Sequence, residues 1–179
     1  MLDNQEKLTA RGTTKGPDYF LDAAKKVLEK DSNVRFIIAG SGDMEHFIIE
    51  KAAHLGISDK VLFAGFLKGK AIDRAYRMAD VYVMPSVSEP FGITPLESIK
   101  NDTPVIISKQ SGVSEVLNNA LKVDFWDINE LANKMLAVLK YKALHSTLRE
   151  EGSKEVKNFS WGNSADKCID VYKKVIGEA

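Results

Sequence analysis

The sequence has one cysteine, Cys168, among its 179 residues. A single thiol cannot form a disulfide within the chain, which suits a reducing compartment, and we expect a cytoplasmic protein. No apolar run approaches the roughly 20 residues that a transmembrane helix needs. The first residues, 1–7, are polar and acidic and do not resemble a signal peptide.

The chain also lacks an excess of charge of either sign, with 25 basic and 25 acidic residues. Charge therefore gives no reason to expect nucleic acid as a partner. The three histidines show no metal-ligand spacing, and no Asp-x-Asp pair, P-loop or Gly-x-Ser-x-Gly elbow is present. We therefore expect neither a metal nor a cofactor. The composition, 44% apolar and 28% charged, is that of a globular protein, and the length predicts one domain over residues 1–179.

Short apolar runs alternate with amphipathic segments along the chain. The runs predict strands at residues 34–39, 61–64, 81–84, 104–107 and 120–123. The intervening patterns predict helices at residues 17–30, 43–55, 70–78, 94–100, 113–118, 128–139, 142–157 and 160–176. This alternation predicts an α/β fold, a Rossmann-like parallel sheet of five or six strands with helices on both faces. Ligands of such sheets bind at the carboxyl ends of the strands.

The segment 89–97 follows one of these predicted strands and carries two carboxylates, Glu89 and Glu97, eight residues apart. Gly92 and the predicted start of a helix lie between them. This order places one carboxylate in a loop at the end of a strand and the other in the first turn of a helix. A helix N-terminus binds phosphate, and carboxylates accept hydrogen bonds from hydroxyl groups. The pattern therefore fits a sugar nucleotide.

Each candidate residue also has a structural interpretation. Thr94 and Glu97 have the spacing of a capping box, in which Thr94 is the N-cap and Glu97 reaches back to its N–H group. Arg11 and Lys15 fit solvated surface charges. The Gly40-Ser41-Gly42 turn begins like a dinucleotide fingerprint, but the sixth position is not glycine, so a tight turn is the simpler interpretation.

Taken together, these residues resemble a known family. The segment 88–97 is similar to the Glu-x7-Glu motif of the retaining group 1 glycosyltransferases, the family 4-like enzymes of GT-B architecture. Other segments of the chain resemble the same family, at residues 15–21, 61–66, 79–86, 103–106, 111–115 and 159–161. The resemblance covers nearly the whole chain from Lys15 onward. It departs from the family around Arg11, which lies four residues before Lys15 and precedes a glycine rather than following one.

The resemblance implies a role for each matching residue. Glu97 would bind the ribose hydroxyls of the donor nucleotide, and Glu89 would lie beside the donor sugar. Lys15 and Arg11 would neutralise the leaving diphosphate, with Lys15 and Glu89 as the catalytic residues. The main chain of Phe91, Gly92 and Ile93 would bind the sugar, and the main chain of Thr94 and Leu96 would bind the diphosphate. The main chain of Leu67 would contact the base. Gly40 and Gly42 are further substrate-binding positions.

Enzymes of this family have two Rossmann-like domains, and the chain resembles the C-terminal, donor-binding one. We therefore expect two partners, a nucleotide sugar and an N-terminal acceptor domain that this chain lacks. The full-length enzyme is expected to transfer a hexose from a nucleoside diphosphate sugar. The isolated chain is expected to be inactive. Peripheral membrane contact of the full-length enzyme stays open. The alternatives are a non-catalytic nucleotide-sugar-binding or regulatory module and one half of a sugar-nucleotide epimerase.

Overall fold

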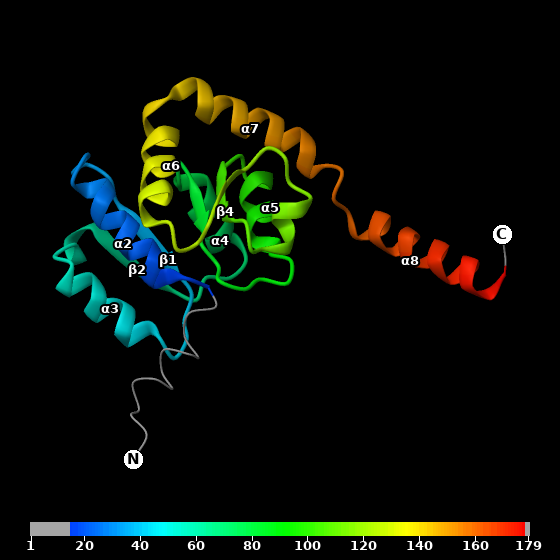
Figure 1. Cartoon of the computed structure of the whole chain (residues 1–179), viewed down its shortest axis with the longest axis horizontal. Coiled ribbons are helices and arrows are strands. Elements are labelled where there is room, and N and C mark those ends of the chain that lie inside the picture. The colour runs from blue at the N-terminus through cyan, green and yellow to red at the C-terminus, as the bar shows by residue number, and fades with distance from the viewer. Residues whose placement is uncertain (1–14, 178–179) are drawn as a thin grey trace, which may run out of the picture.

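Strands and helices alternate in the computed structural model, which describes residues 15–177 (Figure 1). The strands are β1 (Phe36–Ala39), β2 (Val61–Gly65), β3 (Tyr82–Met84), β4 (Val105–Ser108) and β5 (Leu121–Val123). The helices are α2 (Pro17–Leu28), α3 (Glu45–His54), α4 (Lys70–Met78), α5 (Ile93–Lys100), α6 (Ile128–Lys140), α7 (Lys142–Val156) and α8 (Trp161–Ile176). Two single 3-10 turns are η1 (Ser58–Lys60) and η2 (Gly112–Glu115). The predicted elements are confirmed to within two residues at each end, apart from the helix at 113–118.

The helix predicted at 113–118 is wrong, because only the turn η2 forms there. The donors that would continue the helix are used elsewhere. The N–H of Asn118 donates to Glu155 Oε1 at 2.8 Å and that of Asn119 to Glu155 Oε2 at 2.9 Å, so both are taken by α7. At the start of the turn, the N–H of Gly112 donates to the carbonyl of Glu89 at 3.0 Å, and that of Val113 to the carbonyl of Phe91 at 2.7 Å. These last bonds join the loop after β4 to the loop after β3.

All five strands pair in parallel, but in two separate ladders. β1 pairs with β2, with Phe36 opposite Val61, and β4 lies between β3 and β5. Among residues 15–177 no strand joins the two ladders, so the expectation of one continuous sheet is wrong for this part of the chain. The parallel α/β class itself is confirmed.

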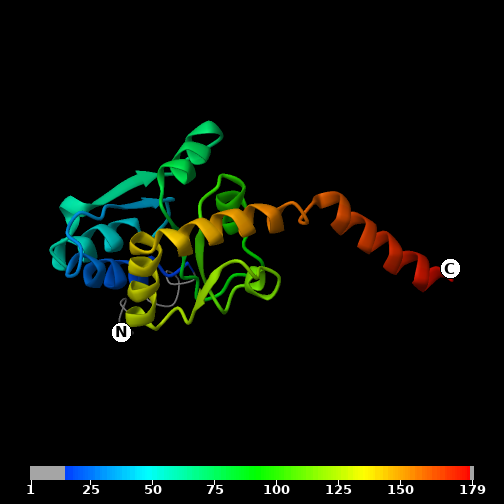
Figure 2. The same ribbon diagram turned by 90° about the horizontal axis from the view of Figure 1, so that it is seen from above.

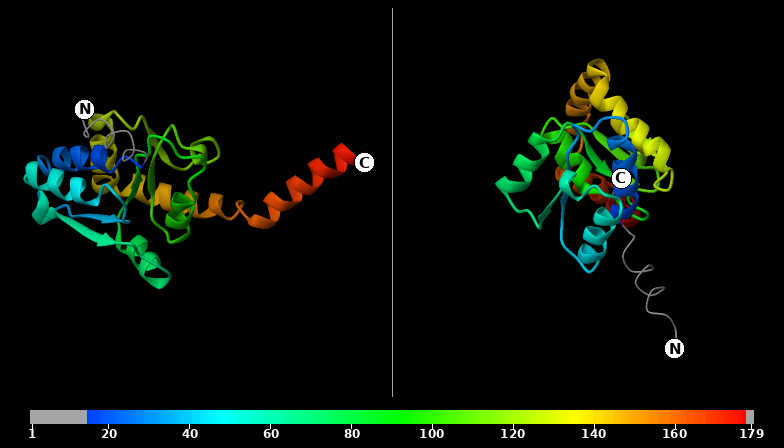
Figure 3. Two further views of the ribbon diagram at one scale, coloured as in Figure 1. Left: turned by 90° about the horizontal axis from the view of Figure 1, so that it is seen from below. Right: turned by 90° about the vertical axis from the view of Figure 1, so that its left-hand side faces the viewer.

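The central strand β4 shows why helices cover both faces. All four of its residues are buried, and successive side chains point to opposite faces of the sheet. Ile106 belongs to a core cluster with residues of α2, α3 and α6, whereas Val105 and Ile107 belong to a second cluster with Ile99 of α5. A strand apolar on both sides can only be stable between two layers of helices. Figures 2 and 3 show these layers from three further directions.

Helix α2 brings the start of the described chain to the carboxyl edge of the sheet. Pro17 occupies its first turn, where the missing N–H group costs no hydrogen bond. Its buried face, which includes Leu21, Ala24 and Val27, packs against α6. The helix therefore has a fixed position, and Lys15 and Gly16 at its N-terminus are held next to the loop that follows β3.

Helix α8 projects away from the rest of the molecule (Figure 1; Figure 3, left). In the described part of the chain it has no buried residue, and Trp161, Tyr172 and Val175 are 82%, 69% and 79% exposed. The preceding Phe159, by contrast, packs against the second core cluster. The folded core therefore ends at about residue 159. Within residues 15–177 no helix is both long and apolar enough to cross a membrane.

We expect deletion of residues 161–179 to leave the melting temperature of the chain unchanged within about 2 °C, because α8 buries no side chain against the core. Thermal unfolding followed by circular dichroism measures this. The control is Phe159→Ala in the full chain, which removes a partly buried ring and should lower the melting temperature by several degrees. A fall of the same size on deleting α8 would show that this helix packs on the core.

Candidate functional site

The loop after β3 is fixed by backbone bonds to the loop after β4. Glu89 forms a parallel bridge with Ser111, and its carbonyl accepts the N–H of Gly112. Its side chain is only 13% exposed. The prediction that segment 89–97 lies at the carboxyl edge of the sheet is confirmed, because the segment begins five residues after the end of β3.

Gly92 is the N-cap of α5 and must be a glycine. Its φ of 97° lies where side chains are strained, and a Cβ atom there would come within 3.0 Å of Met84 Cε and 3.2 Å of Glu89 Cγ. The missing side chain lets the helix start directly beside the Glu89 carboxylate. A helix N-terminus with its unpaired N–H groups therefore lies next to the first carboxylate of the motif.

The prediction that Thr94 caps this helix is wrong. The helix begins at Ile93, one residue earlier than predicted, and among the described residues no side chain caps it. The Thr94 hydroxyl is used by β3, since it accepts from the Tyr82 hydroxyl at 2.9 Å and donates to the Met84 sulfur at 3.6 Å. The capping-box interpretation of Glu97 is therefore wrong as well.

The earlier start also changes which amides are free at the helix end. In an α-helix the N–H groups of the N-cap and the next three residues have no partner within the helix. Here these are the groups of Gly92, Ile93 and Thr94, since Pro95 has no N–H. Leu96 comes next, and among the described residues no hydrogen bond joins its N–H group to the Gly92 carbonyl. Its contact with the diphosphate stays a prediction.

Glu97 lies on the exposed side of α5, and its carboxylate accepts a hydrogen bond from a neighbouring helix. The hydroxyl of Tyr76, on α4, donates to Glu97 Oε2 at 3.3 Å. Burial raises the pKa of Tyr76 far above its ordinary value, and the nearby Tyr82 and Glu97 add to this effect. The phenol therefore keeps its proton and remains a donor at any working pH. Sequence reasoning missed Tyr76, because its contact with Glu97 is made between two helices.

Lys15 is brought to the motif across 74 residues of sequence, and its Nζ atom donates to Glu89 Oε2. The approach depends on Gly16, whose φ is 64° and whose added Cβ would lie 2.0 Å from the Pro85 carbonyl oxygen. The lysine side chain is 66% exposed, so its ammonium group also faces solvent. The structure thus places a cation beside the Glu89 carboxylate.

The two carboxylates of the motif act on the same neighbour, Tyr82. Burial raises the pKa of Tyr82, the hydrogen bond to Thr94 opposes this, and the charges of Glu97 and Glu89 raise it further. The contacts agree with this, because Tyr76 donates to Glu97 and its ring packs against the ring of Tyr82. The structure brings Lys15, Glu89 and Glu97 together around the start of α5.

Other predicted residues lie at the same edge of the fold, farther along it. Gly40 and Gly42 follow β1 and Leu67 follows β2, and the N–H of Gly40 donates to the carbonyl of Gly65 at 2.8 Å. These two loops are therefore joined to each other. Their predicted roles in substrate binding stay predictions. Arg11 lies outside the described residues.

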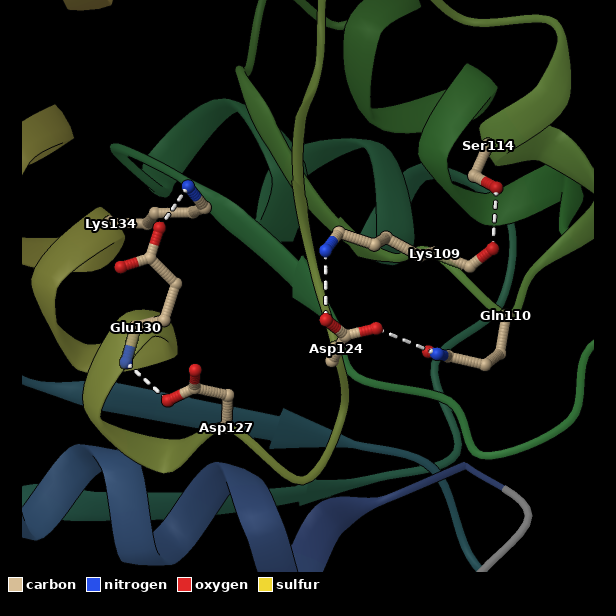
Figure 4. Close-up of polar contacts among 7 residues, drawn as sticks. All are labelled: Lys109, Gln110, Ser114, Asp124, Asp127, Glu130 and Lys134. Atoms are coloured by element: carbon tan, nitrogen blue, oxygen red, sulfur yellow. Dashed lines mark hydrogen bonds and ion pairs between the residues drawn. The ribbon is translucent and has the colours of Figure 1, made fainter.

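A polar cluster next to the motif joins the ends of β4 and β5 (Figure 4). Asp124 accepts from Lys109 Nζ at 2.8 Å and from Gln110 Nε2 at 3.0 Å, and both bonds lower the pKa of Asp124. The hydroxyl of Ser114 donates to the Lys109 carbonyl at 2.8 Å. The charges of this cluster are satisfied internally, so its role is to hold the loop that contacts Glu89.

A metal site or a surface hollow would be a further place where a ligand could bind. Within residues 15–177 no group of three His, Cys, Asp or Glu side chains is placed to hold a metal ion. A shallow hollow lies at the opposite edge of the sheet, because Asp102 precedes β4. Its lining mixes both signs of charge, in Asp102, Arg149, Glu150, Ser153 and Lys154. It therefore has no clear preference for an anionic ligand.

Comparison with known proteins shows the family of the chain. The model of the family described as glycosyl transferases group 1 matches residues 9–155, so the chain belongs to that family. The uncharacterized glycosyltransferase MJ1607 of Methanocaldococcus jannaschii is 36% identical over 163 residues, which are 89% of this chain and 42% of that protein. Mannosylfructose-phosphate synthase of Agrobacterium fabrum is 28% identical over 88% of this chain and 37% of its own length.

A solved structure shows the same fold. Anabaena Alr3699/HepE, crystallised in complex with UDP and glucose, superposes with a TM-score of 0.80 at 20% identity, over 90% of this chain and 45% of that one. The fold is therefore the Rossmann-like domain of GT-B proteins. The chain spans about two fifths of the length of the two curated relatives.

Proposed function

We propose that this chain binds the nucleoside diphosphate sugar of a retaining, metal-independent hexosyltransferase. The observation that carries the proposal is that the Lys15 ammonium group and the free N-terminus of α5 both lie beside the Glu89 carboxylate. A diphosphate is favoured near a cation and a helix N-terminus, because both attract negative charge. The complex of Alr3699/HepE with UDP and glucose supports the class of ligand.

The proposed chemistry follows from the same arrangement. When the bond between sugar and diphosphate breaks, the departing oxygen gains negative charge. Lys15 and the amides of Gly92, Ile93 and Thr94 stabilise that charge from fixed positions. Glu89 accepts hydrogen bonds from the sugar hydroxyls, and Glu97 accepts those of the ribose. Lys15 also offsets the negative charge of Glu89, which lowers its repulsion of the diphosphate.

The remaining roles extend this proposal along the carboxyl edge. Arg11 supports Lys15 against the diphosphate, and the main chain at Leu67 contacts the base, with Gly40 and Gly42 beside it. The acceptor binds to an N-terminal Rossmann-like domain in the full-length protein. Without that domain the chain holds the donor but does not orient an acceptor or exclude water from the reaction. Because the chain belongs to a glycosyltransferase family, a transferase is favoured over the alternative of an epimerase.

The test of this function is the substitution Glu97→Gln. The variant keeps the size and exposed position of the side chain but loses the charge that strengthens hydrogen bonds to a diol. We expect binding of the preferred nucleoside diphosphate to weaken by about tenfold or more, with the melting temperature nearly unchanged. Titration calorimetry with UDP, GDP and ADP measures the affinity and identifies the preferred base.

The control is Glu50→Gln, which neutralises an exposed glutamate of α3 away from the motif. It should bind as tightly as the unchanged chain. Equal affinities of Glu97→Gln and Glu50→Gln would contradict a ribose-binding role for Glu97.

A further inference from the structure

Tyr76 of α4 makes a contact that the proposed function does not explain. Its side chain is buried, with 6% of the residue exposed, yet its hydroxyl donates to Glu97, which is exposed. The bond engages Oε2 alone. The other oxygen, Oε1, is left for a ligand. A buried donor thus sets the direction of an exposed carboxylate.

The ring of Tyr76 is itself held in place. Its backbone carbonyl accepts from the buried Thr103 hydroxyl at 2.7 Å. Its ring packs edge-on against Tyr82, with centroids 5.5 Å apart and planes at 84°. Tyr82 in turn donates to Thr94, in the first turn of α5. The two rings therefore hold α5 at two points: the Tyr76 hydroxyl contacts Glu97, and the Tyr82 hydroxyl contacts Thr94.

The backbone of α5 is fixed at the same interface. The Arg77 guanidinium donates to Asn101 Oδ1 at 3.0 Å, and the Asn101 amide donates to the carbonyl of Glu97 at 3.0 Å. These bonds hold the main chain of Glu97 but leave its side chain free to rotate. Of the contacts at this interface, the Tyr76 hydroxyl is the one that reaches the carboxylate.

A tyrosine suits this position for a chemical reason. A lysine or arginine would also hold Glu97, but it would offset the carboxylate charge and weaken its bonds to hydroxyl groups. A neutral phenol has one proton to donate and leaves the charge of Glu97 in place. Its burial keeps it protonated, as described above.

We propose that Tyr76 is a positioning residue, which holds Glu97 so that the free carboxylate oxygen accepts the hydroxyl groups of the donor ribose. The proposal rests on the proposed function, because it requires a ribose at Glu97. It adds a residue from a different helix to the site. This proposal makes a specific prediction: the Tyr76 hydroxyl should raise the affinity only for nucleotides that carry the ribose hydroxyls.

The test compares Tyr76→Phe with Tyr82→Phe, using whichever of UDP, GDP and ADP binds the unchanged chain most tightly, and its 2′,3′-dideoxy analogue. Both variants remove one hydroxyl from the same edge-on pair, but only Tyr76 contacts Glu97. The bond of 3.3 Å is long, so its loss should weaken binding of the ribonucleotide by about threefold to tenfold. Binding of the dideoxy analogue by Tyr76→Phe should change less than about twofold. Tyr82→Phe, which loses a contact with Thr94 and none with Glu97, should change the affinities for the two ligands by the same factor.

Each other result would overturn the proposal. Equal weakening of both ligands by Tyr76→Phe would show a structural role, and no weakening of either would show that the hydroxyl does not matter. An additive loss in the Tyr76→Phe, Glu97→Gln double variant would show that the two residues act separately. If the unchanged chain binds none of the three nucleotides, the proposed function fails together with this inference, whereas binding without a diol-dependent effect overturns this inference alone. Circular dichroism confirms that each variant is folded.

Discussion

Replacing Gly16 with alanine is expected to lower the melting temperature of the chain by roughly 6–12 °C. The added Cβ would lie 2.0 Å from the Pro85 carbonyl oxygen, and the φ of 64° is unfavourable for alanine. The backbone must move at the point where α2 meets the loop after β3. Strain and lost contacts together should cost about 3 kcal/mol, and a domain of this size loses about 2–4 °C per kcal/mol.

The substitution Gly56→Ala separates the effect of backbone strain from the effect of the clash with Pro85. Gly56 has a similar φ of 67°, but an added Cβ there meets nothing within 4 Å. Its substitution tests the backbone strain alone, which should cost about 1 kcal/mol and lower the melting temperature by about 2–4 °C. Thermal unfolding followed by circular dichroism measures both variants. If they lose the same amount, the close approach between Gly16 and Pro85 is not the reason that a glycine is needed.

Replacing Lys15 with alanine is expected to weaken nucleoside diphosphate binding by about 10-fold to 100-fold. The change removes a charged hydrogen-bond donor, a contribution of about 1.5–3 kcal/mol. It also leaves the partly buried Glu89 carboxylate facing the diphosphate without its partner. The melting temperature should change little, because an ion pair with one exposed member contributes at most about 1 kcal/mol. Titration calorimetry at low salt measures the affinity.

The matched control is Lys154→Ala. Lys154 is 68% exposed and paired with Glu151, so it resembles Lys15 in exposure and charge, but it lies on α7 away from the motif. Its removal should leave the affinity unchanged. An equal loss in both variants would mean that binding responds to the overall charge of the chain and not to a cation at this site.

Local sequence patterns were sufficient for most elements of the fold. The segment 70–78 became α4 with its predicted bounds, and the apolar face of α2 was buried as its spacing predicted. In such elements the spacing of the apolar side chains and the residues at the ends of the segment indicate the same secondary structure. The register of the ladders and their separation into two groups depend on contacts between distant residues, which no local pattern encodes.

The candidate site shows a sharper limit. The position of Glu89 at the end of a strand followed from sequence order. The Lys15–Glu89 contact joins residues 74 apart; the family resemblance assigned both residues to one site but did not predict that they pair. Thr94 satisfied the rule for a cap, but Tyr82 competes for its hydroxyl across the fold. Tyr76 carried no signal in the sequence, because its role depends on how α4 packs against α5.

The most direct test of the central claim is a nuclear magnetic resonance titration of the nitrogen-15-labelled chain with its preferred nucleoside diphosphate. A ligand at the proposed site should shift the amide signals of Gly92, Ile93 and Thr94 most, because these N–H groups would donate to the diphosphate in the proposed complex. The signals near Lys15 and Tyr76 should move with them. Shifts grouped around the hollow between Asp102 and Lys154, or no shifts at millimolar ligand, would contradict the account.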